Sequence, residues 1–272
     1  ALKTQPNVAI ISEEVAEKKQ TLEEVVNHIA DVVKRRAENG ENFGLAVIPE
    51  GLIEFIPEMK QMIGEINDIL AENEEYFGSF QTFEDQAEWI NGKLSRDSSY
   101  VFSSLPNAIQ RQLLMDRDPH GNVKVSQIET EKLLIEMVEQ KLGEMKSRGE
   151  FKGKFAAMAH FFGYEGRCAY PSNFDADYCY SLGYSAFVLV AGGMSGYISS
   201  VSSLAKPASQ WEAGGVPLVN MMNMERRKGE DTPVIKKALV ELDDKPFKAF
   251  AERRDEWVGR DEPYSSGVLL GE

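Results

Sequence analysis

The sequence predicts an α/β fold with parallel strands and a helical insertion. Residues 8–11 and 44–48 are short apolar runs rich in β-branched side chains, as in buried strands. Between them, residues 22–33 repeat apolar side chains every three or four positions, as on an amphipathic helix. A strand, a helix and a second strand with short connections form a βαβ unit, in which the two strands pair in parallel.

The first helix and the second strand have clear boundary signals. Thr21 and Glu24 have the spacing of a capping box, in which each side chain accepts a hydrogen bond from the other residue's backbone. Gly40 ends the helix, because glycine tolerates the left-handed conformation of a helix terminus. The second strand stops at residues 49–51, the sequence Pro-Glu-Gly.

The next part of the chain has a helical pattern. A helix is expected from Pro57 to Leu70, with proline in its first turn. Residues 71–127 give no strand signal. A second capping-box pattern at residues 126–129 predicts a helix that extends to about Lys146.

This helical part is also the most acidic. Residues 51–150 hold 10 basic and 19 acidic side chains, and therefore contribute −9 of the net charge of −14. We expect an acidic helical insertion at residues 64–150, which divides an α/β domain into a first part, residues 1–63, and a remainder, residues 151–272.

The alternation of strands and helices returns after residue 154. We expect strands at residues 155–162, 196–201 and 216–222, and helices at 174–190, from Thr232 onward and within 246–257.

Composition excludes several classes of protein. The chain has 272 residues, 42% of them hydrophobic, which is enough for a sizeable core and excludes a disordered chain. Its net charge of −14 argues against binding to nucleic acid or to an anionic membrane. Two cysteines do not make a secreted disulfide framework, and no apolar stretch is long enough to span a bilayer. A cytoplasmic protein is expected.

Several well-known catalytic and metal motifs do not occur. The sequence contains no Walker phosphate loop, no G-x-G-x-x-G after a strand and no G-x-S-x-G. The three histidines are isolated from one another, and the two cysteines lack metal-ligand spacing. None of these patterns therefore points to catalytic residues or metal ligands in this chain.

Two predicted strands end in polar residues beside glycine. Glu50 follows the second strand, and Tyr164 and Arg167 lie in a glycine-flanked turn after the strand predicted at 155–162. Ligands of open α/β sheets bind beyond such carboxyl ends. A carboxylate can accept hydrogen bonds from sugar hydroxyls, and a guanidinium can bind a phosphate through two N–H groups. A surface ion pair is the alternative role for Arg167.

Six motifs occur in the order found in a known family. They read IPEGLIE at 48–54, SQIETEK at 126–132, HFFGYEGR at 160–167, PSNFDADY at 171–178, AGGVP at 213–217 and NMERR at 223–227. The chain closely resembles the long-chain pyrophosphate-dependent phosphofructokinases over most of its length.

The resemblance implies a fold, a reaction and site residues. The fold is a phosphofructokinase-like three-layer α/β fold with a mostly parallel sheet and a helical insertion. The reaction is the reversible transfer of a phosphoryl group from pyrophosphate to fructose 6-phosphate in glycolysis, with Mg²⁺. By their match to family motifs, Glu50, Tyr164 and Arg167 are the residues that bind fructose 6-phosphate. The resemblance also implies a homodimer.

The sequence departs from the family where the chemistry takes place. The family's Gly-Gly-Asp donor loop, Thr-Ile-Asp catalytic segment and Met-Gly-Arg turn do not occur in it. We therefore expect a C-terminal portion that is inactive alone, with Mg²⁺ and pyrophosphate bound mainly by a missing N-terminal portion. The alternatives are a stand-alone sugar-phosphate-binding or regulatory subunit without catalysis, and a purely structural α/β domain.

Overall fold

The predicted parallel strand pair is present near the N-terminus. In the computed structural model, β1 (Val8–Ala9) pairs in parallel with β2 (Ala46–Val47), with Val8 opposite Ala46. The structure describes residues 1–2, 4–115, 123–125, 128–163, 166, 170–227, 230–235 and 238–259. Two helices connect the strands, rather than the single one expected, and the βαβ prediction is otherwise confirmed.

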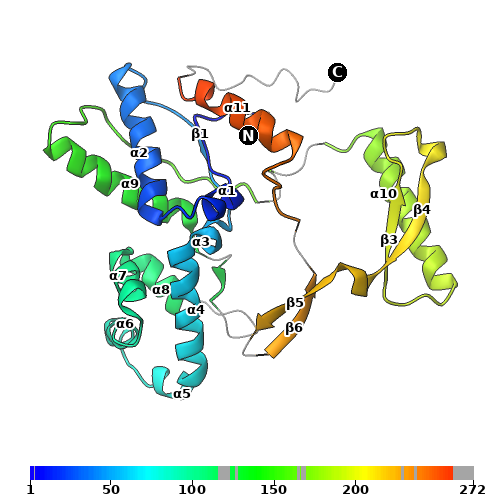
Figure 1. Cartoon of the computed structure of the whole chain (residues 1–272), viewed down its shortest axis with the longest axis horizontal. Helices are drawn as coiled ribbons and strands as arrows, with labels where there is room; N and C mark the ends of the chain where they lie inside the picture. Colours follow the sequence, from blue (N-terminus) through cyan, green and yellow to red (C-terminus); the bar gives the residue numbers. More distant parts are fainter. Residues whose placement is uncertain are drawn as a thin grey trace. The chain divides into compact units, whose positions relative to one another are not determined.

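The chain divides into two compact units, residues 1–161 with 239–272 and residues 162–238, here called unit 1 and unit 2. Besides its two strands, unit 1 consists of helices (Figure 1): α1 (Ser12–Glu17), α2 (Leu22–Glu38), α3 (Leu52–Phe55), α4 (Pro57–Glu72), α5 (Glu74–Phe77), α6 (Phe83–Asn91), α7 (Arg96–Ser104), α8 (Asn107–Met115), α9 (Thr130–Ser147) and α11 (Lys245–Trp257).

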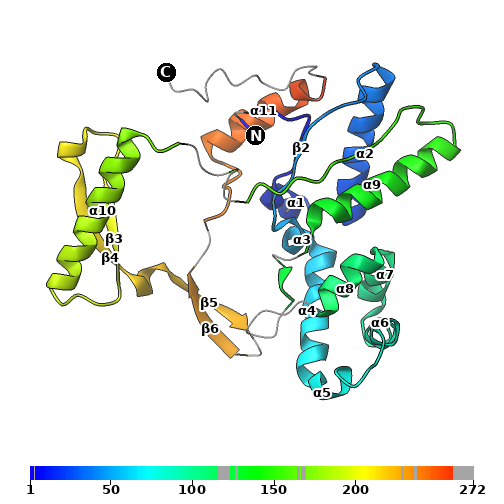
Figure 2. The same cartoon turned by 180° about the vertical axis from the view of Figure 1, so that it is seen from behind.

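Helix α2 forms for the reasons that its sequence gives. The Thr21 hydroxyl accepts the Glu24 N–H at 3.1 Å and the Glu24 carboxylate accepts the Thr21 N–H at 2.9 Å, which confirms the capping box. A third hydrogen bond comes from the tertiary fold, because the Leu22 N–H donates to Glu58 of α4 at 2.8 Å. The apolar face of α2 packs beside α9 (Figures 1 and 2).

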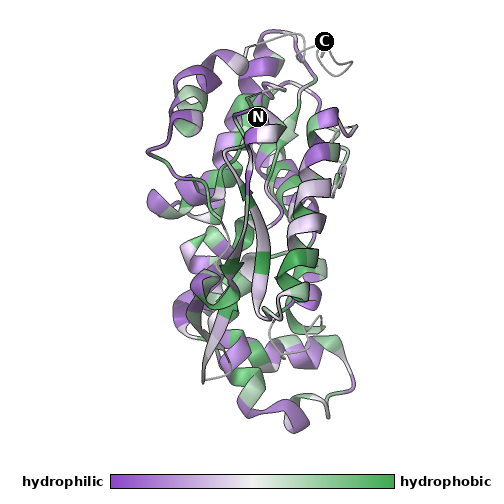
Figure 3. Cartoon of the chain, turned by 90° about the vertical axis from the view of Figure 1, so that its right-hand side faces the viewer, coloured by the Kyte–Doolittle hydropathy of each residue, from purple (hydrophilic) through white to green (hydrophobic). Residues whose placement is uncertain are grey.

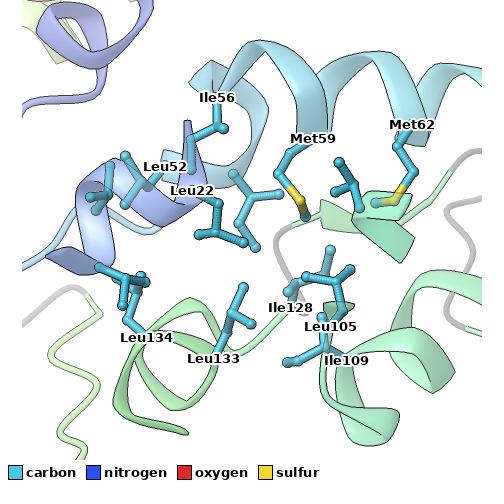
Figure 4. Packing of buried hydrophobic residues seen from close by; sticks show 14 of the residues in the cluster. Leu22, Leu52, Ile56, Met59, Met62, Leu105, Ile109, Ile128, Leu133 and Leu134 are labelled. Atoms are coloured by element: carbon cyan, nitrogen blue, oxygen red, sulfur yellow. The ribbon is translucent and has the colours of Figure 1, made fainter. Parts of the chain in front are cut away.

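A continuous hydrophobic core lies between the helices of unit 1. Helices carry both hydrophobic and hydrophilic residues along their length in Figure 3, the pattern expected when one face is buried. In Figure 4, side chains from α2, α3 and α4 point toward side chains from α8, α9 and the segments that precede them. The labelled members are all buried: Leu22, Leu52, Ile56, Met59, Met62, Leu105, Ile109, Ile128, Leu133 and Leu134.

The described residues of unit 2 form one long helix and two antiparallel strand pairs. Its elements are α10 (Asn173–Ala191), β3 (Tyr197–Ser202), η3 (Ala208–Gln210), β4 (Glu212–Pro217), η4 (Leu218–Met221), β5 (Met222–Arg227) and β6 (Glu230–Ile235). Strands β3 and β4 pair antiparallel, as do β5 and β6. Helix α10 packs on the β3–β4 pair, and the Ser185 hydroxyl donates to the Gly214 carbonyl at 2.9 Å.

The helix predicted at 174–190 and the strand predicted at 196–201 are confirmed by α10 and β3. The predicted helices at 57–70 and within 246–257 are confirmed by α4 and α11. The helix expected from residue 126 begins at Thr130, and the side chain of its N-terminal residue Glu129 makes no capping hydrogen bond to the first turn. Ser126 and Gln127 lie outside the described residues.

Three predictions in the C-terminal half were wrong. Residues 155–162 form no strand, since none of the described strands pairs with them. The strand expected at 216–222 is divided by η4, which follows Pro217. Thr232 begins no helix but lies in β6, opposite Glu225 of β5. In this last case Pro233 starts no helix because pairing with β5 keeps the backbone extended.

The described residues thus form a mixture of helices and small sheets, with one parallel and two antiparallel strand pairs. This architecture is compatible with an α/β fold of the expected kind. For the site, the important part is the end of β2, where the chain leaves the parallel pair and enters α3.

Candidate sugar-phosphate site

Glu50 lies in a tight turn that directly follows the parallel strand pair. The pair is closed by hydrogen bonds from the Val8 N–H to the Leu45 carbonyl and from the Ile10 N–H to the Val47 carbonyl, both 3.1 Å. The Leu52 N–H then donates to the Pro49 carbonyl at 3.2 Å, which turns the chain into α3. Glu50 is exposed in this turn. Its carboxylate is therefore available to a ligand at the carboxyl end of β2, the position that parallel sheets use for binding.

The turn is fixed on both sides by buried groups. Leu52 and Ile53 of α3 follow it directly, and both are fully buried in the core of unit 1. On the other side, the hydroxyl of Thr130, the first residue of α9, donates to the Glu50 carbonyl at 3.3 Å. An exposed carboxylate is thus carried by a backbone that cannot move freely.

Tyr164 and Arg167, the other two predicted sugar-phosphate ligands, lie outside the described residues. They belong to the chain segment of unit 2, whereas Glu50 belongs to unit 1. The convergence of the three side chains on one ligand is therefore still a prediction.

A capping box formed by Ser172 and Asp175 lies a few residues after Arg167 in the sequence. The Asp175 carboxylate accepts the Ser172 N–H and the Ser172 hydroxyl, both at 2.7 Å, and the Ser172 hydroxyl accepts the Asp175 N–H at 3.4 Å. The backbone N–H of Ser172, followed by its hydroxyl, lowers the pKa of Asp175. This capping box begins α10, so Asp175 stabilises the start of the helix.

Sequence reasoning missed Arg36, a buried charge that organises the chain before β2. Arg36 is 3% exposed, and its guanidinium donates to the carbonyls of Phe43 at 2.9 Å and Val258 at 2.7 Å. It also pairs with Glu41 at 3.0 Å. A signal was present, because Arg36 continues the apolar stripe of α2 four residues after Val32, where an arginine is unexpected.

A second missed group attaches α11 to α1. The Arg254 guanidinium donates to both carboxylate oxygens of Glu14, and Lys18 donates to Glu14 at 2.6 Å. Burial raises the pKa of Glu14, but the hydrogen bonds from Arg254 and Lys18 outweigh it and lower that pKa. These side chains line a cavity of about 170 Å³ between β1, α1 and α11. Glu50 is not among the residues that line it. No sequence signal links positions 240 residues apart.

Neither a metal site nor a membrane span is found in the part of the chain that the structure describes. Those residues contain no group of three or more His, Cys, Asp or Glu side chains that could hold a metal ion. None of their helices is both long and apolar enough to cross a membrane.

Curated proteins with similar sequences show what the chain is related to. The chain is 53% identical over 258 residues to the pyrophosphate–fructose 6-phosphate 1-phosphotransferase of Treponema pallidum, and the match covers 95% of this chain. The chain is a homologue of the pyrophosphate–fructose 6-phosphate 1-phosphotransferases. The resemblance drawn from its motifs is confirmed.

The phosphotransferase homology extends to subunits of the plant proteins. The chain is 51% identical over 269 residues to subunit beta 1 from Arabidopsis thaliana, and 37% identical over 267 residues to subunit alpha 2 from the same plant. These matches cover 99% and 96% of this chain, but only 46% and 42% of the relatives. The chain thus spans less than half the length of the curated phosphotransferases that it matches. No family model matches the chain.

Proposed function

We propose that this chain is the fructose 6-phosphate-binding portion of a pyrophosphate-dependent phosphofructokinase. The whole enzyme converts pyrophosphate and fructose 6-phosphate to fructose 1,6-bisphosphate and phosphate, a step of glycolysis. The observation that carries the proposal is the 53% identity over 95% of the chain to a protein named for this reaction. The exposed Glu50 turn at the end of a parallel strand pair is the position that such a ligand requires.

Three side chains divide the recognition of fructose 6-phosphate. The Glu50 carboxylate accepts hydrogen bonds from sugar hydroxyls. The Arg167 guanidinium pairs with the 6-phosphate through two parallel N–H groups, and the Tyr164 hydroxyl donates a further hydrogen bond. Together, the three side chains bind and orient the sugar, so that its 1-hydroxyl faces the phosphoryl donor.

Phosphoryl transfer itself needs groups that the chain does not supply. The reaction requires a base for the 1-hydroxyl, a cradle for pyrophosphate and cations for the developing charge. The Gly-Gly-Asp, Thr-Ile-Asp and Met-Gly-Arg motifs are missing from the sequence. We therefore assign catalysis, pyrophosphate and Mg²⁺ to a further, N-terminal portion of the enzyme, and expect this chain to be inactive alone.

The proposal includes an architecture and an assembly. The α/β domain, formed by residues 1–63 and 151–272, has a three-layer phosphofructokinase-like fold with a mostly parallel sheet, and residues 64–150 are its helical insertion. A cytoplasmic homodimer is proposed as the working form. Several plant relatives are named as subunits, which supports an assembly of more than one chain.

Calorimetric titration of the 272-residue chain with fructose 6-phosphate tests the binding role. Glu50→Gln should weaken binding by about tenfold or more, because a charge-assisted hydrogen bond contributes about 1.5–3 kcal/mol. Arg167→Ala should abolish binding. Glu54→Gln is the matched control, since Glu54 is also exposed and lies one turn further on in α3. Equal binding by the wild type and Glu50→Gln would contradict the role of Glu50.

A subunit without catalysis is the second candidate, because the chain matches plant relatives named as two different kinds of subunit. A coupled assay with pyrophosphate, Mg²⁺ and fructose 6-phosphate examines activity directly. Robust turnover by this chain would contradict both the inactive portion and the non-catalytic subunit. The coding sequence upstream of residue 1 separates these two, since only an enzyme portion is preceded by the missing motifs.

A further inference from the structure

The Glu50 turn has an unexpected neighbour in the helical part of the chain. Thr130 is 80 residues away in sequence and is 3% exposed. Its Oγ1 lies 3.3 Å from the Glu50 carbonyl oxygen and 3.4 Å from the Ile128 carbonyl oxygen. A hydroxyl has a single proton to donate, so these two carbonyls share it. The buried hydroxyl is therefore used to hold two backbone segments together.

The Glu50 carbonyl belongs to a part of the turn with open space beside it. It belongs to the peptide bond that joins Glu50 to Gly51, and the added Cβ of an alanine at position 51 would meet nothing within 4 Å. Gly51 has no side chain that could pack and restrain this peptide, so the Thr130 hydrogen bond adds to the restraint from the Glu54 N–H, which donates to the Gly51 carbonyl at 3.1 Å. Because the rotamers open to Glu50 depend on its backbone angles, fixing this peptide also limits where the carboxylate points.

Thr130 is itself held firmly enough to act as an anchor. Gln112 of α8 accepts the Glu129 N–H at 3.2 Å and donates to the Glu129 carboxylate at 3.2 Å. On the next turn of α9, Leu133 and Leu134 are 0% and 1% exposed. They point into the same core as Leu52, two residues after Glu50 (Figure 4). The hydroxyl is thus presented from a packed helix start toward a packed turn.

We propose that Thr130 is a positioning residue for Glu50, through which the helical part of the chain sets the geometry of the sugar site. The proposal rests on the proposed function, because it takes Glu50 to be the sugar ligand. Thr130 touches no substrate. It removes the freedom of the Glu50–Gly51 peptide before the sugar arrives, so less ordering is required on binding.

Hydrogen exchange tests the anchor without any ligand. In Thr130→Val, which keeps the shape of the side chain and removes its hydroxyl, the amides of the peptide covering residues 48–56 should exchange about 2- to 10-fold faster, the effect of one lost hydrogen bond. Thr130→Ser should restore the wild-type rate. Val138→Ala is the control for general loosening, since Val138 lies on α9 at 1% exposure and two turns away. Equal exchange in Thr130→Val and the wild type, or equal acceleration in Val138→Ala, overturns the proposal.

Titration with fructose 6-phosphate separates this inference from the function on which it rests. Thr130→Val should raise the dissociation constant about 2- to 10-fold. Thr130→Ser and Val138→Ala should bind as the wild type does. If Glu50→Gln weakens binding and Thr130→Val does not, the positioning role is wrong while the proposed function stands. If the wild type and Glu50→Gln bind alike, the proposed function of Glu50 fails, and the exchange result still decides whether Thr130 anchors the turn.

Discussion

The two units of the chain differ in how they exclude water. In unit 1, large apolar side chains from most of its helices are fully buried, and even Trp257 in α11 is 0% exposed. Among the described residues of unit 2, only Ser185 and Val201 are buried. Large apolar side chains of α10 stay exposed, including Tyr180, Phe187 and Val190, the last at 76%.

The difference follows from what each unit has to pack. The ten helices described in unit 1 can enclose a core from several sides, whereas the one helix described in unit 2 packs on a pair of strands and covers a single face of it. Unit 1 is therefore stabilised mainly by apolar burial. Within unit 2, the stabilising interactions are caps, strand hydrogen bonds and ring contacts such as that between Phe174 and Trp211, with centroids 5.3 Å apart. Each of these interactions contributes less than the burial of a large side chain.

The largest difference between the units is expected when one apolar side chain in each is replaced by alanine. Leu133→Ala removes a fully buried side chain of α9 and should lower the free energy of unfolding of unit 1 by about 2–5 kcal/mol. Val190→Ala on α10 replaces an exposed side chain and should change the free energy of unfolding of unit 2 by no more than about 0.5 kcal/mol. Urea denaturation followed by hydrogen exchange of peptides from each unit measures both. A large loss in Val190→Ala would show that α10 is covered by other protein in solution.

A smaller contrast concerns buried polar groups. Arg36→Met removes the bonds to the Phe43 and Val258 carbonyls and should destabilise unit 1 by about 1.5–3 kcal/mol. Ser185→Ala removes one neutral bond to the Gly214 carbonyl in unit 2 and should cost about 0.5–1.5 kcal/mol. The same denaturation experiment compares the two losses. A larger loss in Ser185→Ala than in Arg36→Met would contradict the expectation that a charged donor contributes more than a neutral one.

Two helical glycines should respond alike in both units. An added Cβ would meet nothing within 4 Å at Gly64 in α4 or at Gly183 in α10. Gly64→Ala and Gly183→Ala should each stabilise the unit that contains it by about 0.5–1 kcal/mol, since alanine loses less backbone entropy. Thermal unfolding measures the gain. A loss at Gly183 alone would again indicate that another surface lies against α10.

Acid should weaken one carboxylate contact in each unit. Burial raises the pKa of Glu65, but hydrogen bonds from Gln61 and from the Ser95 N–H and hydroxyl lower it from 4.5 to about 2. Its stabilising contribution is therefore complete above pH 4.5 and is lost as the pH falls toward 2. The pKa of Asp175 is lowered from 3.8 by the Ser172 N–H, so its contribution is lost below pH 3.8.

Melting temperatures of Glu65→Gln and Asp175→Asn between pH 7 and pH 2 test these contributions. Each variant should melt below the wild type at pH 7, and the gap should close as the pH falls below the ordinary pKa of the carboxyl that was replaced. A gap that stays constant from pH 7 to pH 2 would contradict the role of the ionised form. Asp175 is exposed and Glu65 is only half-buried, so solvent screens both contacts and the shifts in melting temperature should be the smallest of the series.

Local signals in the sequence predicted what depends on neighbouring residues. The Thr21 and Ser172 caps, Pro57 at a helix start and the apolar stripe of α2 act within one or two turns, and all occur in the structure. Predictions failed where a partner distant in sequence decides. Residues 155–162 have the composition of a strand without a described strand to pair with, and Thr232 pairs with β5 in spite of a helix-like start.

The candidate site divides in the same way. The sequence alone determined Glu50, Tyr164 and Arg167 as the expected ligands of fructose 6-phosphate, because motif order and residue chemistry can be read along the chain. Only the tertiary structure revealed that Thr130 contacts the Glu50 carbonyl, that Arg36 joins two loops and that Glu14 pairs with Arg254. Such contacts depend on where the packing of the core brings distant segments together, and no local pattern records that placement.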